Sequence, residues 1–136
     1  MNERREILVV DDEASDLSLM CNALRLEGYR VISASCYLEA FDSFRLHSGK
    51  FDLLVTDIAL PYKNGCELAK TLLAIDPGLK VLLVSGLSGA EVLRYCRLHG
   101  QPATPFLQKP IDRDKFVKLV HEILEPGASV GTTNAG

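Results

Sequence analysis

Long apolar runs are missing from this chain of 136 residues. No stretch approaches the roughly 20 apolar residues that a membrane-spanning helix needs, so the sequence argues against a membrane-embedded protein. The first residues, MNERRE, are charged and lack the apolar core of a signal peptide. Because the length also fits one domain, the sequence predicts a single soluble domain in the cytoplasm, without contact to a membrane.

Paired cysteines and an excess of basic charge are also missing. The chain has four isolated cysteines, Cys21, Cys36, Cys66 and Cys96. They form no Cys-x-x-Cys pair, so we expect buried thiols rather than a disulfide or a zinc site. The 15 Lys and Arg residues are outnumbered by 18 Asp and Glu residues, which gives a net charge of −3. Without a basic stripe, direct binding of nucleic acid is not expected.

What the chain does have is a regular alternation of short apolar runs and amphipathic stretches. Strand-like runs lie at 7–10, 29–33, 51–56, 81–84 and 104–108. Apolar residues at helical spacing predict helices around 17–28, 38–49, 68–75 and 89–99, and a last one from a cap at Asp112 to a stop at Pro126. This alternation predicts an α/β fold, with a parallel five-stranded sheet covered by helices on both faces.

Two local features set the limits of this fold. Pro105 lies in the fifth expected strand and removes a ladder donor, so that strand should lie at an edge of the sheet. Residues 126–136 are mostly Gly, Ala, Ser, Thr and Asn, a composition that predicts a flexible C-terminal tail or the start of a linker in a longer protein. The domain is therefore expected to cover residues 5–125.

Polar residues follow four of the five apolar runs. Asp11 and Asp12 follow the first run, Asp57 the third, Ser85 the fourth and Lys109 the fifth. Each alone would be explained as a helix cap, a loop residue or a surface lysine. In a parallel sheet, however, the carboxyl ends of the strands meet at one edge, where open α/β folds bind ligands. We therefore expect three carboxylates, a hydroxyl and an ammonium group in one pocket.

The chemistry of such a pocket can be derived from its groups. Crowded carboxylates repel one another unless a cation joins them, and a hard divalent ion such as Mg²⁺ prefers oxygen ligands. A carboxylate can also accept a phosphoryl group as an acyl phosphate. Asp57 is the expected acceptor, while Lys109 and Ser85 would stabilise the phosphoryl oxygens.

A wider pattern contains these residues: Asp11-Asp12-Glu13, Asp57 followed by Pro61 and Gly65, Ser85-Gly86, and Phe106 before Lys109-Pro110. This pattern resembles the receiver domain of two-component response regulators over about residues 5–125. The resemblance implies a flavodoxin-like, doubly wound sheet of strand order 2-1-3-4-5. That order agrees with the edge position that Pro105 requires.

The resemblance also implies a function and a set of site residues. Asp57 would accept a phosphoryl group from a histidine kinase or a phosphotransfer protein, so the domain would be a regulatory phosphoacceptor and not an enzyme. As in receivers, Mg²⁺ would be held by Asp12, Asp57, the backbone carbonyl of Ala59 and, through a water, Asp11. The Lys109-Pro110 bond would be cis.

Ser85 and Phe106 occupy the positions of the receiver switch, in which a hydroxyl and an aromatic ring respond to the phosphoryl group. The fourth helix, fifth strand and fifth helix would then contact a downstream protein target or a fused domain. Phe106 has no hydroxyl, and we expect its buried rotamer to be favoured even without phosphate. Ala59 and Leu87 flank the path of hydrolytic water in receivers and are apolar here, which predicts slow self-dephosphorylation.

Other phosphate-handling folds fit less well. A haloacid dehalogenase needs a second Asp two residues after its nucleophile, where this chain has Ala59. A P-loop or dinucleotide-binding domain needs a Gly-rich turn after the first strand, and Asp11 to Ser15 contains no glycine. The remaining alternative is a receiver fold that acts as a protein-interaction module without phosphorylation.

Overall fold

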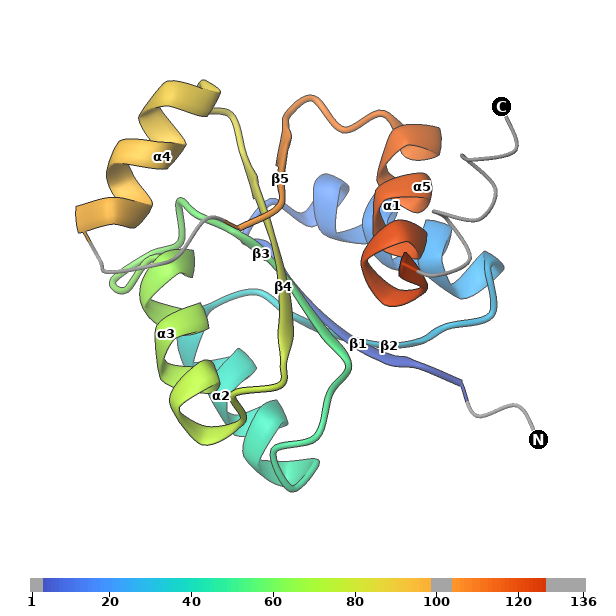
Figure 1. Cartoon of the computed structure of the whole chain (residues 1–136). Helices are drawn as coiled ribbons and strands as arrows, with labels where there is room; N and C mark the ends of the chain where they lie inside the picture. The colour runs from blue at the N-terminus through green and yellow to red at the C-terminus, as the bar shows by residue number, and fades with distance from the viewer. Residues whose placement is uncertain (1–3, 99–103, 127–136) are drawn as a thin grey trace.

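Strands and helices alternate along the whole of the described chain (Figure 1). The computed structural model describes residues 4–98 and 104–126. In chain order, the elements are β1 (Glu6–Val10), α1 (Ala14–Leu26), β2 (Arg30–Ala34), α2 (Tyr37–Leu46), β3 (Leu53–Asp57), α3 (Gly65–Ile75), β4 (Lys80–Ser85), α4 (Gly89–Leu98), β5 (Phe106–Gln108) and α5 (Arg113–Leu124).

All five strands form one parallel sheet in the order β2-β1-β3-β4-β5. This confirms the doubly wound, flavodoxin-like fold. The central strands are buried on both faces, which explains why their sequences are nearly continuous apolar runs. The registers Val10–Thr56 and Asp57–Val84 align the carboxyl ends of β1, β3 and β4 at one edge of the sheet.

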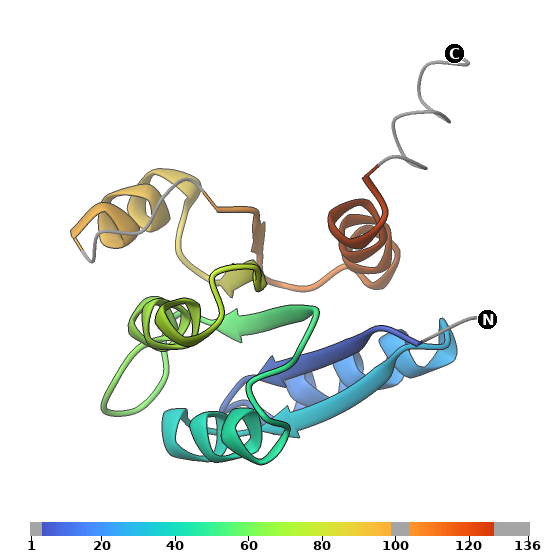
Figure 2. The same cartoon turned by 60° about the horizontal axis from the view of Figure 1, so that its bottom comes forward.

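Helices cover both faces of the sheet (Figures 1 and 2). Helices α1 and α5 pack on one face, where Met20 and Phe116 belong to a buried apolar cluster. Helices α2, α3 and α4 lie on the other face, where Phe44, Leu72 and Val92 belong to a second cluster. Because both faces are covered, a ligand can reach the sheet itself only at its edge strands or at the strand ends.

The edge position expected for the fifth strand is confirmed, because β5 pairs with β4 alone among the described strands. The strand begins at Phe106, just after Pro105, whose carbonyl accepts the Leu83 N–H at 2.9 Å. Proline therefore stands where its missing donor is not needed. The expected cap of α5 is also present, since the Asp112 carboxylate accepts the Lys115 N–H at 3.1 Å.

Two expectations about burial are wrong. Leu38, the first apolar residue of the helix expected at 38–49, is 69% exposed, because the buried residues of α2 are Ala40 and Phe44. Cys36 is only half-buried, because it caps α2 in a turn, whereas the thiols of Cys21 and Cys66 are buried. The side chain of Cys96 lies outside the described part of the chain.

The remaining expectations concern the chain ends and the membrane. Of the tail expected at 126–136, the structure describes only Pro126, and the end expected for the fourth helix near 99 also lies outside the described residues. Within 4–98 and 104–126, no helix has the length and apolar character required to cross a bilayer.

Candidate functional site

Three aspartates meet at the carboxyl edge of the sheet. Asp11 directly follows β1, and its N–H donates to the Ala34 carbonyl of β2 at 3.1 Å; Asp57 is the last residue of β3. Asp11, Asp12 and Asp57 each offer a carboxylate oxygen, and these oxygens lie within 4.8 Å of one another. Asp11 and Asp57 are buried, whereas Asp12 is exposed. The arrangement combines two fixed carboxylates with one that faces solvent.

Lys109 reaches this group from the loop after β5. Its Nζ lies 3.0 Å from an Oδ2 atom of each of three residues, Asp11, Asp16 and Asp57. Burial alone would lower the pKa of Lys109, but the contacts with these carboxylates outweigh burial and raise it. Lys109 therefore stays positively charged across the physiological pH range.

Asp11 has an unusual environment. Its Oδ1 accepts the Glu13 N–H at 2.9 Å, but its Oδ2 is buried and has no hydrogen-bond partner in the described structure. This Oδ2 atom forms an ion pair with the Lys109 ammonium, whose Nζ lies 3.0 Å away. Burial raises the pKa of Asp11 to about 6, against the lowering by the Glu13 N–H. A buried carboxylate oxygen that holds only this ion pair in the described structure, beside two further carboxylates, fits a divalent cation.

The loop after β3 holds Asp57 in place. The Ala59 N–H donates to Asp57 Oδ1 at 3.0 Å, and the Gly65 N–H donates to the Ile58 carbonyl at 2.9 Å. Asn64 and Glu67 form a reciprocal capping box at the start of α3. The loop is therefore held both at the end of β3 and at the start of α3.

The two expected switch residues lie on β4 and β5. Ser85 is buried at the end of β4, where its hydroxyl oxygen accepts the Leu87 N–H at 3.1 Å and its carbonyl accepts the Lys109 N–H at 2.8 Å. Phe106 is half-buried and packs against the cluster under α2, α3 and α4. The Lys109-Pro110 bond is cis, as the resemblance implied.

One carboxylate at the site, Asp16, was not predicted from the sequence. It lies in the first turn of α1 and not at a strand end. From sequence, an acidic residue there is explained by the positive end of the helix dipole alone. Its contact with Lys109 depends on how α1 and the loop after β5 come together in the fold.

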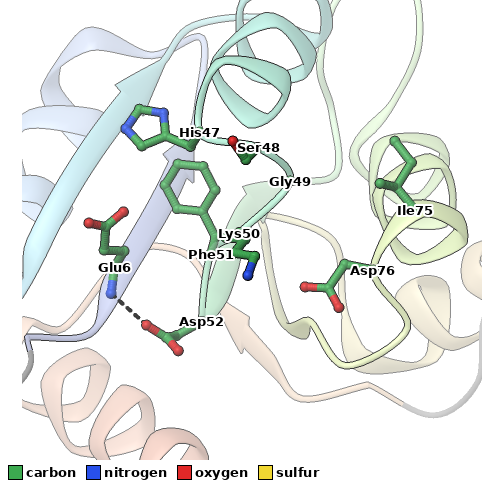
Figure 3. Close-up of a pocket in the computed structure, with 9 residues that line it drawn as sticks. All are labelled: Glu6, His47, Ser48, Gly49, Lys50, Phe51, Asp52, Ile75 and Asp76. Carbon is green, nitrogen blue, oxygen red and sulfur yellow. Dashed lines mark hydrogen bonds between the residues drawn. The ribbon is translucent and has the colours of Figure 1, made fainter.

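A separate cavity of about 730 Å³ lies near the amino ends of β1 and β3, opposite the strand ends that carry the aspartates (Figure 3). It is lined by residues that begin β1 or flank β3, together with the end of α3. Two of its polar groups have partners: the Asp52 carboxylate accepts the Glu6 N–H at 2.7 Å, and His47 Nδ1 lies 2.9 Å from the Ser43 carbonyl. None of Asp11, Asp12, Asp57 and Lys109 lines this cavity, so it is separate from the acidic group.

Known proteins are similar to this chain in sequence and in fold. The family model of the response regulator receiver domain matches residues 7–121. The transcriptional regulatory protein ZraR of Klebsiella oxytoca is 33% identical over 122 residues, which make up 90% of this chain and only 27% of ZraR. The chemotaxis protein CheY of Treponema pallidum is 28% identical over 120 residues, 88% of this chain and 82% of that protein.

Solved structures agree with this assignment. A CheY-like receiver domain from Methanospirillum hungatei has a TM-score of 0.79 and 26% identity to this chain, and the match covers 93% of this chain and 98% of that one. The family match spans every strand of the sheet except the first residue of β1. The chain therefore belongs to the response regulator receiver domain family.

Proposed function

We propose that this domain, over residues 5–125, is a phosphoacceptor of two-component signalling that receives a phosphoryl group on Asp57. The observation that carries the proposal is the contact of the Lys109 ammonium with Asp57 Oδ2 at 3.0 Å, beside the group of three carboxylates. A carboxylate nucleophile, a fixed positive charge and a set of oxygen ligands are the parts that phosphoryl transfer needs.

Each residue has a separate role in the transfer. An Asp57 oxygen forms the new P–O bond while the P–N bond of a donor phosphohistidine breaks, and the bonding electron pair leaves with the imidazole. Lys109 and the Ser85 hydroxyl donate to the phosphoryl oxygens as charge develops on them. Asp12, Asp57, the Ala59 carbonyl and, through a water, Asp11 would hold Mg²⁺, which neutralises charge on the phosphoryl group when bound.

The donor of this chemistry is a histidine kinase or a phosphotransfer protein, because a phosphohistidine supplies the phosphoryl group at a neutral, readily displaced nitrogen. Ser85 and Phe106 then carry the signal to the face formed by α4, β5 and α5. From that face the signal passes to a downstream protein target or to a fused domain. We propose a regulatory role for the domain and not that of an enzyme, and a cytoplasmic location stays a prediction.

The test is incubation with acetyl phosphate and Mg²⁺, followed by intact mass measurement. We expect a gain of one phosphoryl group, absent in Asp57→Asn and absent with a chelator. Phosphate found on a serine or histidine would contradict the assignment of Asp57. If wild-type protein gains no phosphoryl group under any donor, the domain acts as an interaction module without phosphorylation.

Binding of Mg²⁺ should depend on pH through Asp11. The folded protein holds the Asp11 proton up to a pKa of about 6, above the ordinary value of 3.8, and a protonated carboxyl cannot serve the metal. The affinity for Mg²⁺ therefore has its full value above this pKa, where Asp11 is ionised. Below this pKa it falls by about tenfold per pH unit. Mg²⁺ titrations followed by NMR at several pH values between 7.5 and 5.5 measure the affinity. Asp11→Asn is the variant expected to lose the pH dependence. A constant affinity over this range would contradict the prediction.

The acyl phosphate should be long-lived. Ala59 is exposed beside Asp57, and Leu87 is half-buried next to Ser85; neither side chain can orient a hydrolytic water. We expect Ala59→Asn to shorten the phosphoryl lifetime about tenfold, because its amide can hold that water. Ala74→Asn, at an exposed alanine in the last turns of α3, is the matched control. The lifetimes are measured from the loss of phosphoryl mass over time. Equal lifetimes in wild type and both variants would refute the role of position 59.

A further inference from the structure

Asp16 makes a contact that the proposed chemistry has not used. It stands in the first turn of α1, and its side chain is 27% exposed. Its Oδ2 lies 3.0 Å from Lys109 Nζ, as close as the oxygens of Asp11 and Asp57. The described structure thus surrounds one ammonium with three carboxylates from three different segments of the chain.

The three carboxylates differ in what happens to them during the proposed reaction. Asp11 and Asp57 belong to the group whose oxygens can hold a metal ion, and Asp57 also becomes phosphorylated. Both residues therefore change their partners when metal and phosphoryl group arrive. Asp16 is not a member of that group and is not modified. Its contact with Lys109 can persist while the contact with Asp57 Oδ2 passes to a phosphoryl oxygen.

We propose that Asp16 is a positioning residue: it anchors the Lys109 ammonium from the side of α1 so that the ammonium stays directed at the phosphoryl group. This inference rests on the proposed function, since it names how Lys109 is held for that reaction. The first turn of α1 suits the role, because a negatively charged side chain interacts favourably with the positive end of the helix. The contact also bridges α1 and the loop between β5 and α5.

The direction of the effect separates this role from a simple effect of charge. If Asp16 acted only by its negative charge, it would repel the incoming phosphoryl group, and removing it would speed the reaction. If it positions Lys109, removing it leaves the ammonium free to move among the remaining acceptors, and the reaction slows. Mutation of a residue that orients a group at a reaction site typically lowers the rate by about 10- to 100-fold.

The kinetic test compares Asp16→Asn and Asp16→Glu with wild type, using acetyl phosphate at saturating Mg²⁺. Asn keeps the shape but removes the charge, and we expect phosphorylation about tenfold slower. Glu restores the charge on a longer side chain, so it should recover part of the loss. Asp114→Asn is the matched control, because Asp114 is also acidic, in the first turn of a helix, and pairs with Arg113 instead of Lys109. A rate in Asp16→Asn equal to or above wild type overturns the proposal.

A second set of readouts needs no turnover, and the first of them needs no metal. The ¹⁵Nζ resonance of Lys109, assigned from its absence in Lys109→Arg, should show slow exchange of the ammonium protons with water in wild type. In Asp16→Asn this exchange should quicken and the affinity for beryllofluoride with Mg²⁺ should fall about tenfold, while the affinity for Mg²⁺ alone changes less than about threefold. Unchanged ammonium exchange would overturn the proposal. Because this exchange is measured on unphosphorylated protein, failure of the anchor is distinguished from a wild-type protein that accepts no phosphoryl group.

Discussion

Lys109→Met is expected to slow phosphorylation of Asp57 by about 100-fold or more. The ammonium of Lys109 lies 3.0 Å from Asp57 Oδ2 and is largely shielded from water, so no solvent cation can replace it with the same geometry. Removing one such fixed donor to developing negative charge typically lowers a rate by about 10²- to 10³-fold. Rates of acyl phosphate formation from acetyl phosphate, at equal Mg²⁺, measure the loss.

The same substitution should lower stability, because it leaves three carboxylates without their common positive partner. Asp11 and Asp57 are buried, and removal of one member of a buried ion pair costs about 3 kcal/mol. Saturating Mg²⁺ should return part of this loss, since the ion offers the carboxylates a new partner. Urea unfolding with and without Mg²⁺ measures both effects. Lys115→Met, at an exposed lysine of α5, is the control; equal losses in the two variants would contradict this account.

The strand ends could be predicted from sequence because their signal is local. Each buried strand is a run of apolar residues closed by a polar one, and a parallel sheet brings these closing residues to one edge without further information. That is why the approach of Asp57 to Asp11, and of Lys109 to both, follows from the order of the strands. The edge position of β5 could be predicted for a similar reason, since the missing N–H of Pro105 is a property of that residue alone.

Features that depend on how elements pack together could not be predicted in this way. Asp16 is one turn into α1, where an acidic residue is already accounted for by the helix dipole. Only the approach of α1 to the loop after β5 makes it a partner of Lys109. Leu38 is exposed for a similar reason. Its spacing from Phe41 and Phe44 fits one helical face, but a neighbouring face of α2 packs against the sheet.

The loop after β3 leads to the second large effect, which concerns Gly65. A Cβ at this position would lie 2.1 Å from the Asp57 carbonyl oxygen and 2.9 Å from Thr56 Oγ1. The nearest of these atoms is backbone of the strand end that carries the phosphoacceptor, so no side-chain rotation can relieve the clash. The glycine that follows Asp57 in the sequence pattern is therefore required by the close approach of α3 to β3.

Gly65→Ala should consequently lower the free energy of unfolding by about 3 kcal/mol, at the upper end of what overpacking costs. It should also slow phosphorylation, because relief of the clash must shift the backbone of Asp57. Urea unfolding and acetyl phosphate kinetics measure the two effects. The matched control is Gly89→Ala at the start of α4, where the described structure has no atom within 4 Å of the new Cβ and the change should stay within about 1 kcal/mol. If Gly65→Ala were as stable and as reactive as Gly89→Ala, the proposed approach of α3 to the Asp57 backbone would be wrong.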